Sequence, residues 1–158
     1  MKQSKIEKGN WDKHWKIITF FLGAYETLQK EQFKLYQQLI DGDLKKNARF
    51  VEFGAGTGWL SQKIAEKYGA KGLLIDSSKE AKTFFQNHNS SPLLHYKRMD
   101  AFKFKQKNNS DLVFSDGLIE HFVGEKQKKL VLIHKNAAKP KGKIILMVPR
   151  KSKRYQLV

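Results

Sequence analysis

Three glycines at alternate positions, Gly54, Gly56 and Gly58, follow a short apolar run at residues 49–53. Apolar residues at helical spacing come next, which predicts a strand, a glycine turn and a helix in that order. Glycine has no Cβ, so the backbone of such a turn can approach a ligand closely, and the following helix begins with free N–H groups. Because ligands of open α/β sheets lie beyond the carboxyl ends of the strands, this turn predicts a cleft for a nucleotide-like ligand.

The rest of the chain repeats the alternation of strand and helix. Residues 11–40 have helical periodicity, with apolar side chains such as Ile18, Phe21, Leu22 and Leu28. Further strands are expected at residues 72–75, 93–99, 112–115 and 144–148, the last after a turn at residues 140–142. These patterns predict an α/β fold, a Rossmann-like and mainly parallel sheet with helices on both faces.

Two later helices have recognisable start signals. Ser77 and Glu80 fit a capping box, which predicts that a helix opens directly after the strand at residues 72–75. Residues 118–138 predict another helix, which we expect to be interrupted near Gly124.

The spacing of the glycines narrows the class of ligand. A dinucleotide fingerprint needs a glycine at the position where this chain has Trp59. A phosphate-binding loop needs Gly-Lys followed by Ser or Thr, and the turn has no such sequence. NAD and ATP are therefore both disfavoured.

The segment Glu-Phe-Gly-Ala-Gly-Thr-Gly at residues 52–58 resembles the first motif of class I S-adenosylmethionine-dependent methyltransferases. The resemblance continues through Asp76, Asp100 and residues 111–122, so that it spans most of residues 50–149. It implies a methyltransferase with S-adenosylmethionine as its cofactor. Methyl transfer from a sulfonium needs position and charge from the protein and no catalytic triad.

The resemblance also implies roles for particular residues. Asp76 would accept hydrogen bonds from the ribose hydroxyls, although it could also simply cap its strand. Asp100 would contact the adenine, or could be a turn aspartate. The expected cofactor contacts are Glu52, Gly54, Ala55, Gly56, Gly58, Asp76, Ser77, Asp100, Ala101, Ser115, Asp116 and Gly117.

The acceptor is constrained by the stretch Ser-Asp-Gly-Leu-Ile-Glu-His-Phe at residues 115–122. It resembles a variant common in small-molecule methyltransferases, with Asp116 where that subgroup often has Asn. Glu120 and His121 would face the acceptor pocket, and His121 is a candidate catalytic residue, with a structural role as the alternative. We expect a small-molecule, lipid-like or saccharide acceptor. Because enzymes of one RNA 2′-O-methyltransferase group have a Ser-Asp pair here, RNA is an alternative acceptor.

The resemblance also bears on domain organisation. Residues 1–47 are expected to form a helical segment, in which Trp11 and Trp15 would cover the cofactor or pack in the core, and residues 48–158 a single cofactor-binding core. The family fold has seven strands, whereas this chain ends just after the fifth. An open sheet edge, with self-association as one consequence, is therefore expected. A fragment, a minimal form completed by self-association and a remnant without activity are the three explanations.

The formal net charge is +16 in 158 residues, which suits a polyanionic partner such as RNA or an anionic surface. Lysine-rich solvated faces, or a non-catalytic basic binding module, would have the same composition. The chain has no cysteine, which excludes disulfides and a cysteine nucleophile, and no metal is expected. No apolar run approaches the roughly 20 residues that cross a bilayer, and the first ten residues lack the apolar core of a secretory signal. We therefore expect a cytoplasmic location.

Overall fold

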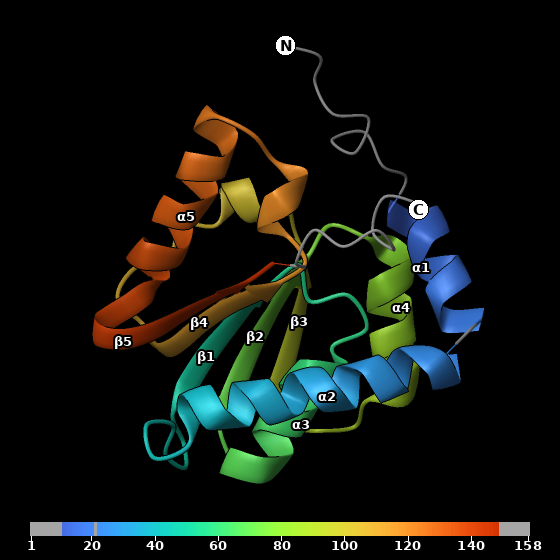
Figure 1. Cartoon of the computed structure of the whole chain (residues 1–158), viewed down its shortest axis with the longest axis horizontal. Helices are drawn as coiled ribbons and strands as arrows, with labels where there is room; N and C mark the ends of the chain where they lie inside the picture. Colours follow the sequence, from blue (N-terminus) through green and yellow to red (C-terminus); the bar gives the residue numbers. More distant parts are fainter. Residues whose placement is uncertain (1–10, 21, 149–158) are drawn as a thin grey trace.

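The computed structural model describes residues 11–20 and 22–148, with the side chains of residues 18–28 left outside this description. The described residues form a five-stranded sheet in the order β3-β2-β1-β4-β5, and all neighbouring strands are parallel (Figure 1). The strands are β1 (Arg49–Phe53), β2 (Lys71–Asp76), β3 (Leu94–Arg98), β4 (Ser110–Asp116) and β5 (Ala138–Met147). The predicted Rossmann-like α/β fold is confirmed.

Helices cover both faces of this sheet, as the sequence predicts (Figure 1). The helices are α1 (Trp11–Phe20), α2 (Leu22–Ile40), α3 (Trp59–Tyr68), α4 (Lys79–His88) and α5 (Glu125–Ala137), with short 3₁₀ turns η2 (Ala101–Lys103) and η3 (Ile119–His121). Side chains alternate along β1, so that Phe50 packs with α2 and α3 while Val51 and Phe53 pack with α5. This alternation places one apolar core on each face.

The core on the α2 and α3 face is the larger one. Tyr36 and Ile40 from α2 and Ile64 from α3 are buried against Phe50 and Phe114 of the sheet. Burying each such side chain contributes roughly 1.5–3 kcal/mol of hydrophobic free energy. Helix α2 is therefore part of the core, and α1 is the part of the N-terminal segment that packs on α4 instead.

The helical periodicity predicted over residues 11–40 corresponds to helices α1 and α2. The side chains of Ile18, Phe21, Leu22 and Leu28 lie outside the described residues. The predicted interruption near Gly124 is confirmed, because η3 ends at His121 and Gly124, with φ +62°, precedes the first residue of α5.

The expected start of the last strand at residue 144 is wrong, and the expected turn at residues 140–142 lies inside that strand. Strand β5 begins at Ala138 rather than at residue 144, and it passes through this segment as a bulge. Ser110 pairs with Ala138 whereas Leu112 pairs with Lys143, and Lys141 takes φ +67° to absorb the extra residues. A bulge keeps the β4 pairing on both sides, which a chain-reversing turn would not.

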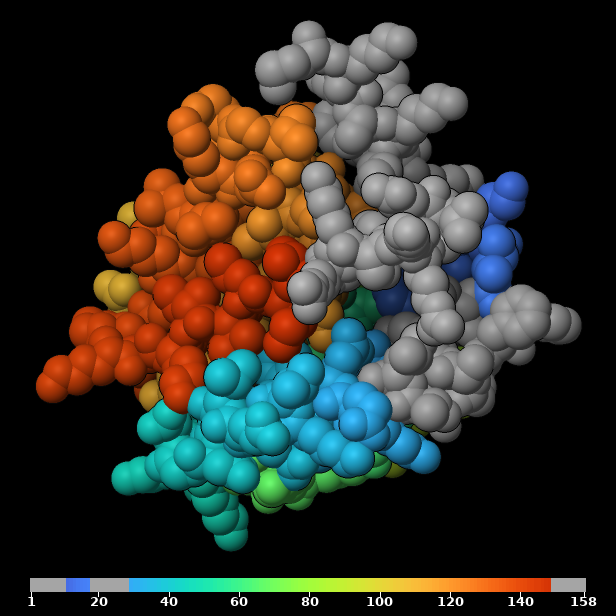
Figure 2. All heavy atoms as spheres, in the orientation of Figure 1, coloured from blue at the N-terminus to red at the C-terminus, as the bar shows by residue number. Residues whose placement is uncertain are grey.

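Strands β3 and β5 each pair with a single strand, so they are the edges of the described sheet. One of them, β5, lies beside α2 (Figure 2), and Lys143 donates from Nζ to the Leu39 carbonyl and to Asp43 at this contact. Self-association through an edge stays a prediction.

The strand order reverses between β1 and β4. From β1 the chain adds β2 and β3 on one side, then crosses to add β4 and β5 on the other. The crevice at such a switch point is where open α/β sheets bind ligands, and both Gly54 and Asp116 lie at it. No helix among the described residues has the length and apolar character needed to span a membrane.

Candidate functional site

All three glycines of the turn after β1 have left-handed backbone conformations, with φ of +71°, +53° and +74° at Gly54, Gly56 and Gly58. At two of them, other side chains of the protein occupy the space that a Cβ would take. A Cβ on Gly58 would lie 2.6 Å from a ring carbon of Phe85 and 2.8 Å from Leu74, and one on Gly54 would lie 3.1 Å from Leu118. These two glycines therefore have a packing role that the sequence pattern does not reveal.

Gly56 is the glycine whose free face lies toward α1. Two ring carbons of Trp15 lie 2.1 and 2.2 Å from the position that a Cβ on Gly56 would take. The open cradle expected from the sequence is thus covered by a protein side chain in this structure. Trp15 lies over the glycine turn, and a role of this residue in covering the cofactor stays a prediction.

The carboxylate of Asp76 points into the same turn. Its Oδ2 accepts from the Gly56 N–H at 2.9 Å, and its Oδ1 accepts from the Ser78 N–H at 2.8 Å. Burial raises its pKa, and the backbone donors partly oppose that shift. The side chain therefore shapes the turn, and each oxygen keeps a lone pair for a ligand hydroxyl. The ribose contact stays a prediction.

Helix α4 begins one residue later than the capping box implies. Its N-cap is Ser78, whose Oγ accepts from the Ala81 N–H, so the prediction of Ser77 as the cap is wrong. The reason is that Asp76 already holds the Ser78 N–H and turns the chain there.

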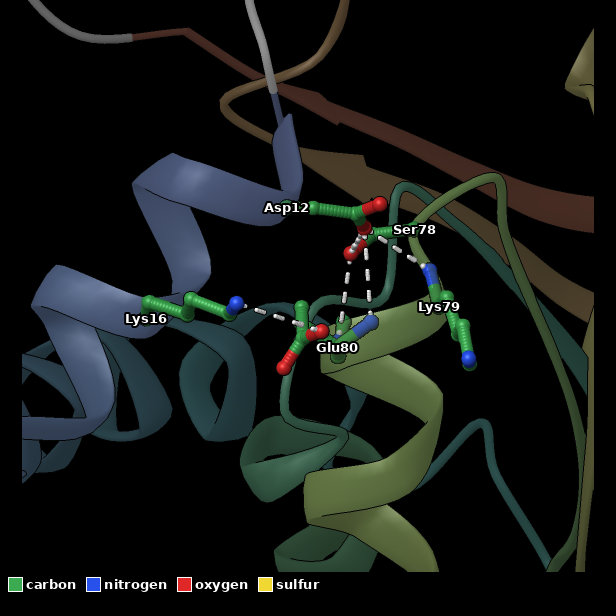
Figure 3. A network of polar contacts seen from close by, with 6 residues as sticks. Asp12, Lys16, Ser78, Lys79 and Glu80 are labelled. Atoms are coloured by element: carbon green, nitrogen blue, oxygen red, sulfur yellow. Dashed lines mark hydrogen bonds and ion pairs between the residues drawn. The ribbon is translucent and has the colours of Figure 1, made fainter.

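A second carboxylate, that of Asp12 on α1, also caps α4 (Figure 3). Its Oδ1 accepts from Ser78 Oγ at 2.6 Å and from the N–H groups of Lys79 and Glu80 at 2.9 and 3.3 Å. The Ser78 hydrogen bond is the largest influence on the pKa of Asp12, which is lowered. An anion at a helix N-terminus is favourable, so Asp12 fastens α1 to α4, and Lys16 pairs with Glu80 nearby.

A hollow of about 280 Å³ lies at the carboxyl ends of β2 and β3. Its lining residues are Ser77, Arg98, Met99, Asp100 and Lys103. Asp100 Oδ1 accepts from the Phe102 N–H at 2.9 Å as the N-cap of η2, which fits the turn-aspartate alternative. Its position in the hollow, next to Ala101, leaves the adenine contact as a prediction. A larger hollow of about 400 Å³ lies at the opposite, amino ends of the strands.

Carboxylates gather at the switch point between β1 and β4. Glu52 is buried and accepts from Ser61 Oγ at 2.5 Å, while Asp116 Oδ1 accepts from Gln32 Nε2 at 3.3 Å. Burial, followed by the nearby charge of Glu120, raises the pKa of Asp116 to about 6. Burial also raises the pKa of Glu52, with Ser61 opposing and the charges of Asp116 and Asp76 adding to it.

Several buried polar atoms at this edge have no hydrogen-bond partner among the described residues. They are Gln32 Oε1, Tyr36 OH, Ser115 Oγ, Asp116 Oδ2, Glu120 Oε2 and His121 Nδ1. Sequence reasoning missed Gln32 and Tyr36, because both lie in the periodic pattern of a core helix and nothing in that pattern marks a site. An unpaired buried polar atom costs free energy, and six of these atoms lie together at the switch point, whereas Asn89 Nδ2 and His134 Nε2 are unpaired elsewhere.

Ser115 and Asp116 are neighbours in β4, so their side chains point to opposite faces of the sheet. Ser115 pairs in register with Phe53, which packs toward α5, whereas Asp116 contacts Gln32 of α2 on the opposite face. His121 lies beyond them, with the Trp11 ring edge-on at 4.7 Å. This contact fits a structural role, and a catalytic role for His121 stays a prediction. Within the described residues, no group of His, Asp or Glu has the arrangement of a metal site.

A comparison with protein families matches residues 50–142 to the family described as Methyltransferase domain. The chain belongs to this family. A search of the curated proteins finds no match.

Solved structures with the same fold as this methyltransferase domain include three informative relatives. A protein from Galdieria sulphuraria, described as a candidate sarcosine dimethylglycine methyltransferase, has a TM-score of 0.64 at 16% identity over 75% of this chain and 46% of its own. Phosphoethanolamine N-methyltransferase 2 from Haemonchus contortus, in complex with phosphomonomethylethanolamine and S-adenosylhomocysteine, has a TM-score of 0.62 at 23% identity over 80% of this chain and 31% of its own. An S-adenosylmethionine-dependent methyltransferase from Geobacter sulfurreducens, in complex with S-adenosylhomocysteine, has a TM-score of 0.59 at 18% identity over 73% of this chain and 47% of its own.

The methyltransferase domain therefore spans less than half the length of these three structures. At these identities the likeness concerns the fold, which is that of S-adenosylmethionine-dependent methyltransferases.

Proposed function

We propose that this methyltransferase domain binds S-adenosylmethionine and transfers its methyl group to a small-molecule acceptor. The observation that carries the proposal is the placement of Asp76, Glu52 and Asp116 along the carboxyl ends of three adjacent strands, around the glycine turn. A row of carboxylates favours a ligand that carries positive charge, and the cofactor has both a sulfonium and an ammonium group.

The residues present fit this cofactor. The hollow at Ser77 and Asp100, the Cβ-free face at Gly56 and the unpaired Oδ2 of Asp116 follow one another along the carboxyl ends of the strands. When bound, S-adenosylmethionine supplies a methyl group activated by its positively charged sulfur. The chain supplies position and charge: Asp76 would bind the ribose hydroxyls, Asp100 and Ala101 would adjoin the adenine, and Glu52 and Asp116 would face the methionine end.

A ligand on the Gly56 face would compete with the Trp15 ring, so binding requires this ring to move, either by rotation of the side chain or by a shift of α1. Asp12 fastens α1 to the start of α4 (Figure 3). A shift of α1 would break these hydrogen bonds, whereas a rotation of the Trp15 side chain would leave them in place. This coupling makes α1 a cover that responds to the cofactor.

A small-molecule acceptor is supported by the Ser-x-Gly-x-Ile-Glu-His-Phe stretch and by the names of two relatives. The Haemonchus contortus protein is a phosphoethanolamine N-methyltransferase, and the Galdieria sulphuraria protein is described by sarcosine and dimethylglycine. The formal net charge of +16 favours RNA as the alternative acceptor. The carboxylates of Asp116 and Glu120 oppose this alternative where the polyanionic backbone of RNA would come close to them.

Isothermal titration of the folded protein with S-adenosylmethionine and S-adenosylhomocysteine tests the first half of the proposal. We expect saturable binding of both, and a folded sample that binds neither would refute a cofactor-binding role. Transfer of a radiolabelled methyl group, offered small-molecule extracts and bulk RNA in parallel, then tests the acceptor. Label confined to RNA would replace the small-molecule proposal with the RNA alternative.

A further inference from the structure

The hollow of about 400 Å³ at the amino ends of the strands, here called the amino-end hollow, is separate from the cofactor edge. Its lining includes the first residue of each of four neighbouring strands, namely Arg49 of β1, Lys71 of β2, Leu94 of β3 and Ser110 of β4. It shares no lining residue with the hollow at Ser77 and Asp100. A ligand in it would therefore lie at the opposite ends of the strands from the glycine turn.

Positive charge and N–H donors dominate the polar lining of the amino-end hollow. Arg49 and Lys71 are exposed cations, and no aspartate or glutamate is among the described residues that line it. Arg49 Nη1 donates to Asn109 Oδ1 at 2.8 Å, which leaves the Nδ2 amide of Asn109 and the other guanidinium N–H groups for a ligand. The carboxylate of Asp111, next to the hollow in sequence, accepts from the Arg49 N–H and from Lys139. This lining matches an anion.

The positive charge continues past the hollow along β3, which is an edge strand. Lys97 lies two residues after His95, a lining residue, so both side chains point to the same face of the sheet. In the connection from β3 to β4, the exposed Lys105 and Lys107 flank Gln106, which also lines the hollow. Residues 94–109 contain five cations, Lys97, Arg98, Lys103, Lys105 and Lys107, against the single acid Asp100. A row of like charge longer than the hollow fits a ligand with repeated negative charge.

The phosphates of a nucleic-acid strand fit this surface better than other anions do. Phe50 is the only Phe, Tyr or Trp in the described lining, and it is buried, so phosphates rather than stacked bases would carry the binding. None of the exposed large apolar side chains of the described residues lines the hollow, which disfavours insertion into a lipid surface. A ligand with one phosphate would leave Lys97, Lys105 and Lys107 unused. A flexible single strand can follow a hollow that a stiff duplex would bridge.

We infer that this protein binds the phosphate backbone of a single-stranded nucleic acid at the amino-end hollow. Arg49 and Lys71 contact phosphates inside the hollow, and Lys97, Lys105 and Lys107 contact the strand outside it. The inference goes beyond the proposed function, because this site lies away from the cofactor edge and the bound strand is not the methyl acceptor. It also gives the formal net charge of +16 a location on the molecule.

The test measures the binding of a fluorescently labelled oligouridylate of about 12 nucleotides by anisotropy, between about 50 and 300 mM salt. Each phosphate contact to a single strand contributes about −0.7 to the slope of log K against log salt. Five contacts therefore give an expected slope of about −3.5. Binding should not require S-adenosylmethionine, because the cofactor edge takes no part in it.

Variants of two lining cations locate the site. Arg49→Gln/Lys71→Gln should reduce the steepness of the slope by about 1.4 and weaken binding about tenfold or more at 50 mM salt. Lys71→Gln alone should reduce the steepness by about 0.7, and it removes only an exposed side chain, so folding is preserved. Lys30→Gln/Lys34→Gln is the matched control, because it removes the same charge from exposed positions on α2. The control should keep the parent slope.

The inference is overturned if the protein does not bind the oligonucleotide, or if the control variant loses as much affinity as the Arg49 and Lys71 variants. Uridine monophosphate that competes as strongly as the oligonucleotide would assign the hollow to a small phosphate ligand instead. A duplex that binds more tightly than the single strand, or phosphatidylserine vesicles whose binding alone responds to the variants, would also contradict it. Titration with S-adenosylhomocysteine tests the proposed function separately, and its affinity should be the same in all these variants.

Discussion

Asp111 and Asp116 lie near opposite ends of β4, and their carboxylates have opposite surroundings. Asp111 accepts from the Arg49 N–H and from Lys139 Nζ, each at 2.8 Å. Burial alone would raise its pKa, but these donors outweigh burial and lower it. Asp116 has Gln32 as its donor and Glu120 as a like-charged neighbour, and burial with this charge raises its pKa to about 6.

This difference in pKa distinguishes the amino ends of the strands from their carboxyl ends. At the amino ends of the strands the protein satisfies its own carboxylate, which is what stability favours. At the carboxyl ends Glu52, Asp76 and Asp116 crowd together, although the chain as a whole carries a formal charge of +16. Crowding of buried like charges costs stability, and of these three carboxylates only Asp116 has an oxygen, Oδ2, without a partner among the described residues.

The largest expected effect concerns Asp76. Asp76→Ala should weaken S-adenosylhomocysteine binding by about 1–3 kcal/mol, or roughly fivefold to more than a hundredfold, because the proposed charge-assisted hydrogen bonds to the ribose are lost. Isothermal titration measures the change, and circular dichroism checks that the variant folds. Asp76→Asn, which keeps the shape, should lose less. Unchanged affinity in both variants would remove Asp76 from the ligand-binding edge.

Next in size is the effect of Asp116 on folding. The pKa of this carboxyl in the folded protein is about 6, above its usual value of 3.8, so between these two pH values the folded state holds a proton that the unfolded chain has released. Its contribution to stability is therefore lost as pH rises from about 4 to about 6. Asp116→Asn should raise the unfolding free energy by roughly 1–3 kcal/mol at pH 7 and by little at pH 4.

Urea denaturation of the parent and of Asp116→Asn at both pH values measures this difference. Glu120, Glu52 and Tyr36 also face Asp116 and stay the same in the two proteins, so the difference isolates its carboxylate. Equal destabilisation at both pH values would mean that Asp116 is a satisfied structural residue like Asp111.

Asp111 should behave in the opposite way. Asp111→Ala should lower the unfolding free energy by about 1 kcal/mol at pH 7, because the Arg49 N–H and Lys139 lose their acceptor. The lowered pKa means that this stabilisation is present near neutral pH and disappears as pH falls below its usual range. Thermal melts at pH 7 and pH 3 measure the loss. Cofactor affinity should not change, and a change would weaken the division between the two edges.

The smallest expected effect is that of Trp15. Because its ring covers Gly56, Trp15→Ala should increase the fraction of molecules with an open turn and tighten S-adenosylhomocysteine binding by about threefold. Isothermal titration of Trp15→Ala measures this change in affinity. Trp59→Ala is the comparison variant, because it also removes a tryptophan but one that packs against the core of the α2 and α3 face. Weaker binding in Trp15→Ala would mean that the ring holds the ligand rather than competing with it.

Much of the fold could be predicted from local pattern. Glycines at alternate positions after an apolar run, and carboxylates at successive strand ends, place β1, β2 and the turn between β1 and α3 correctly, since these features depend on neighbours in the chain. The N-cap of α4 at Ser78 and the early start of β5 at Ala138 could not be predicted. Asp76 and the β4 pairing determine them from outside the local sequence.

The order of motifs in the sequence determined the parallel sheet and placed the glycine turn at the carboxyl ends of the strands, because strand direction and crossover geometry follow from the alternation of strand and helix. Only the tertiary structure decided that Gly54 and Gly58 serve packing, that Trp15 covers Gly56, and that Gln32 and Tyr36 join Asp116. The physical reason is that burial, the proximity of charges and the pairing of a polar atom depend on residues distant in the chain. The periodicity along one helix or strand does not identify those residues.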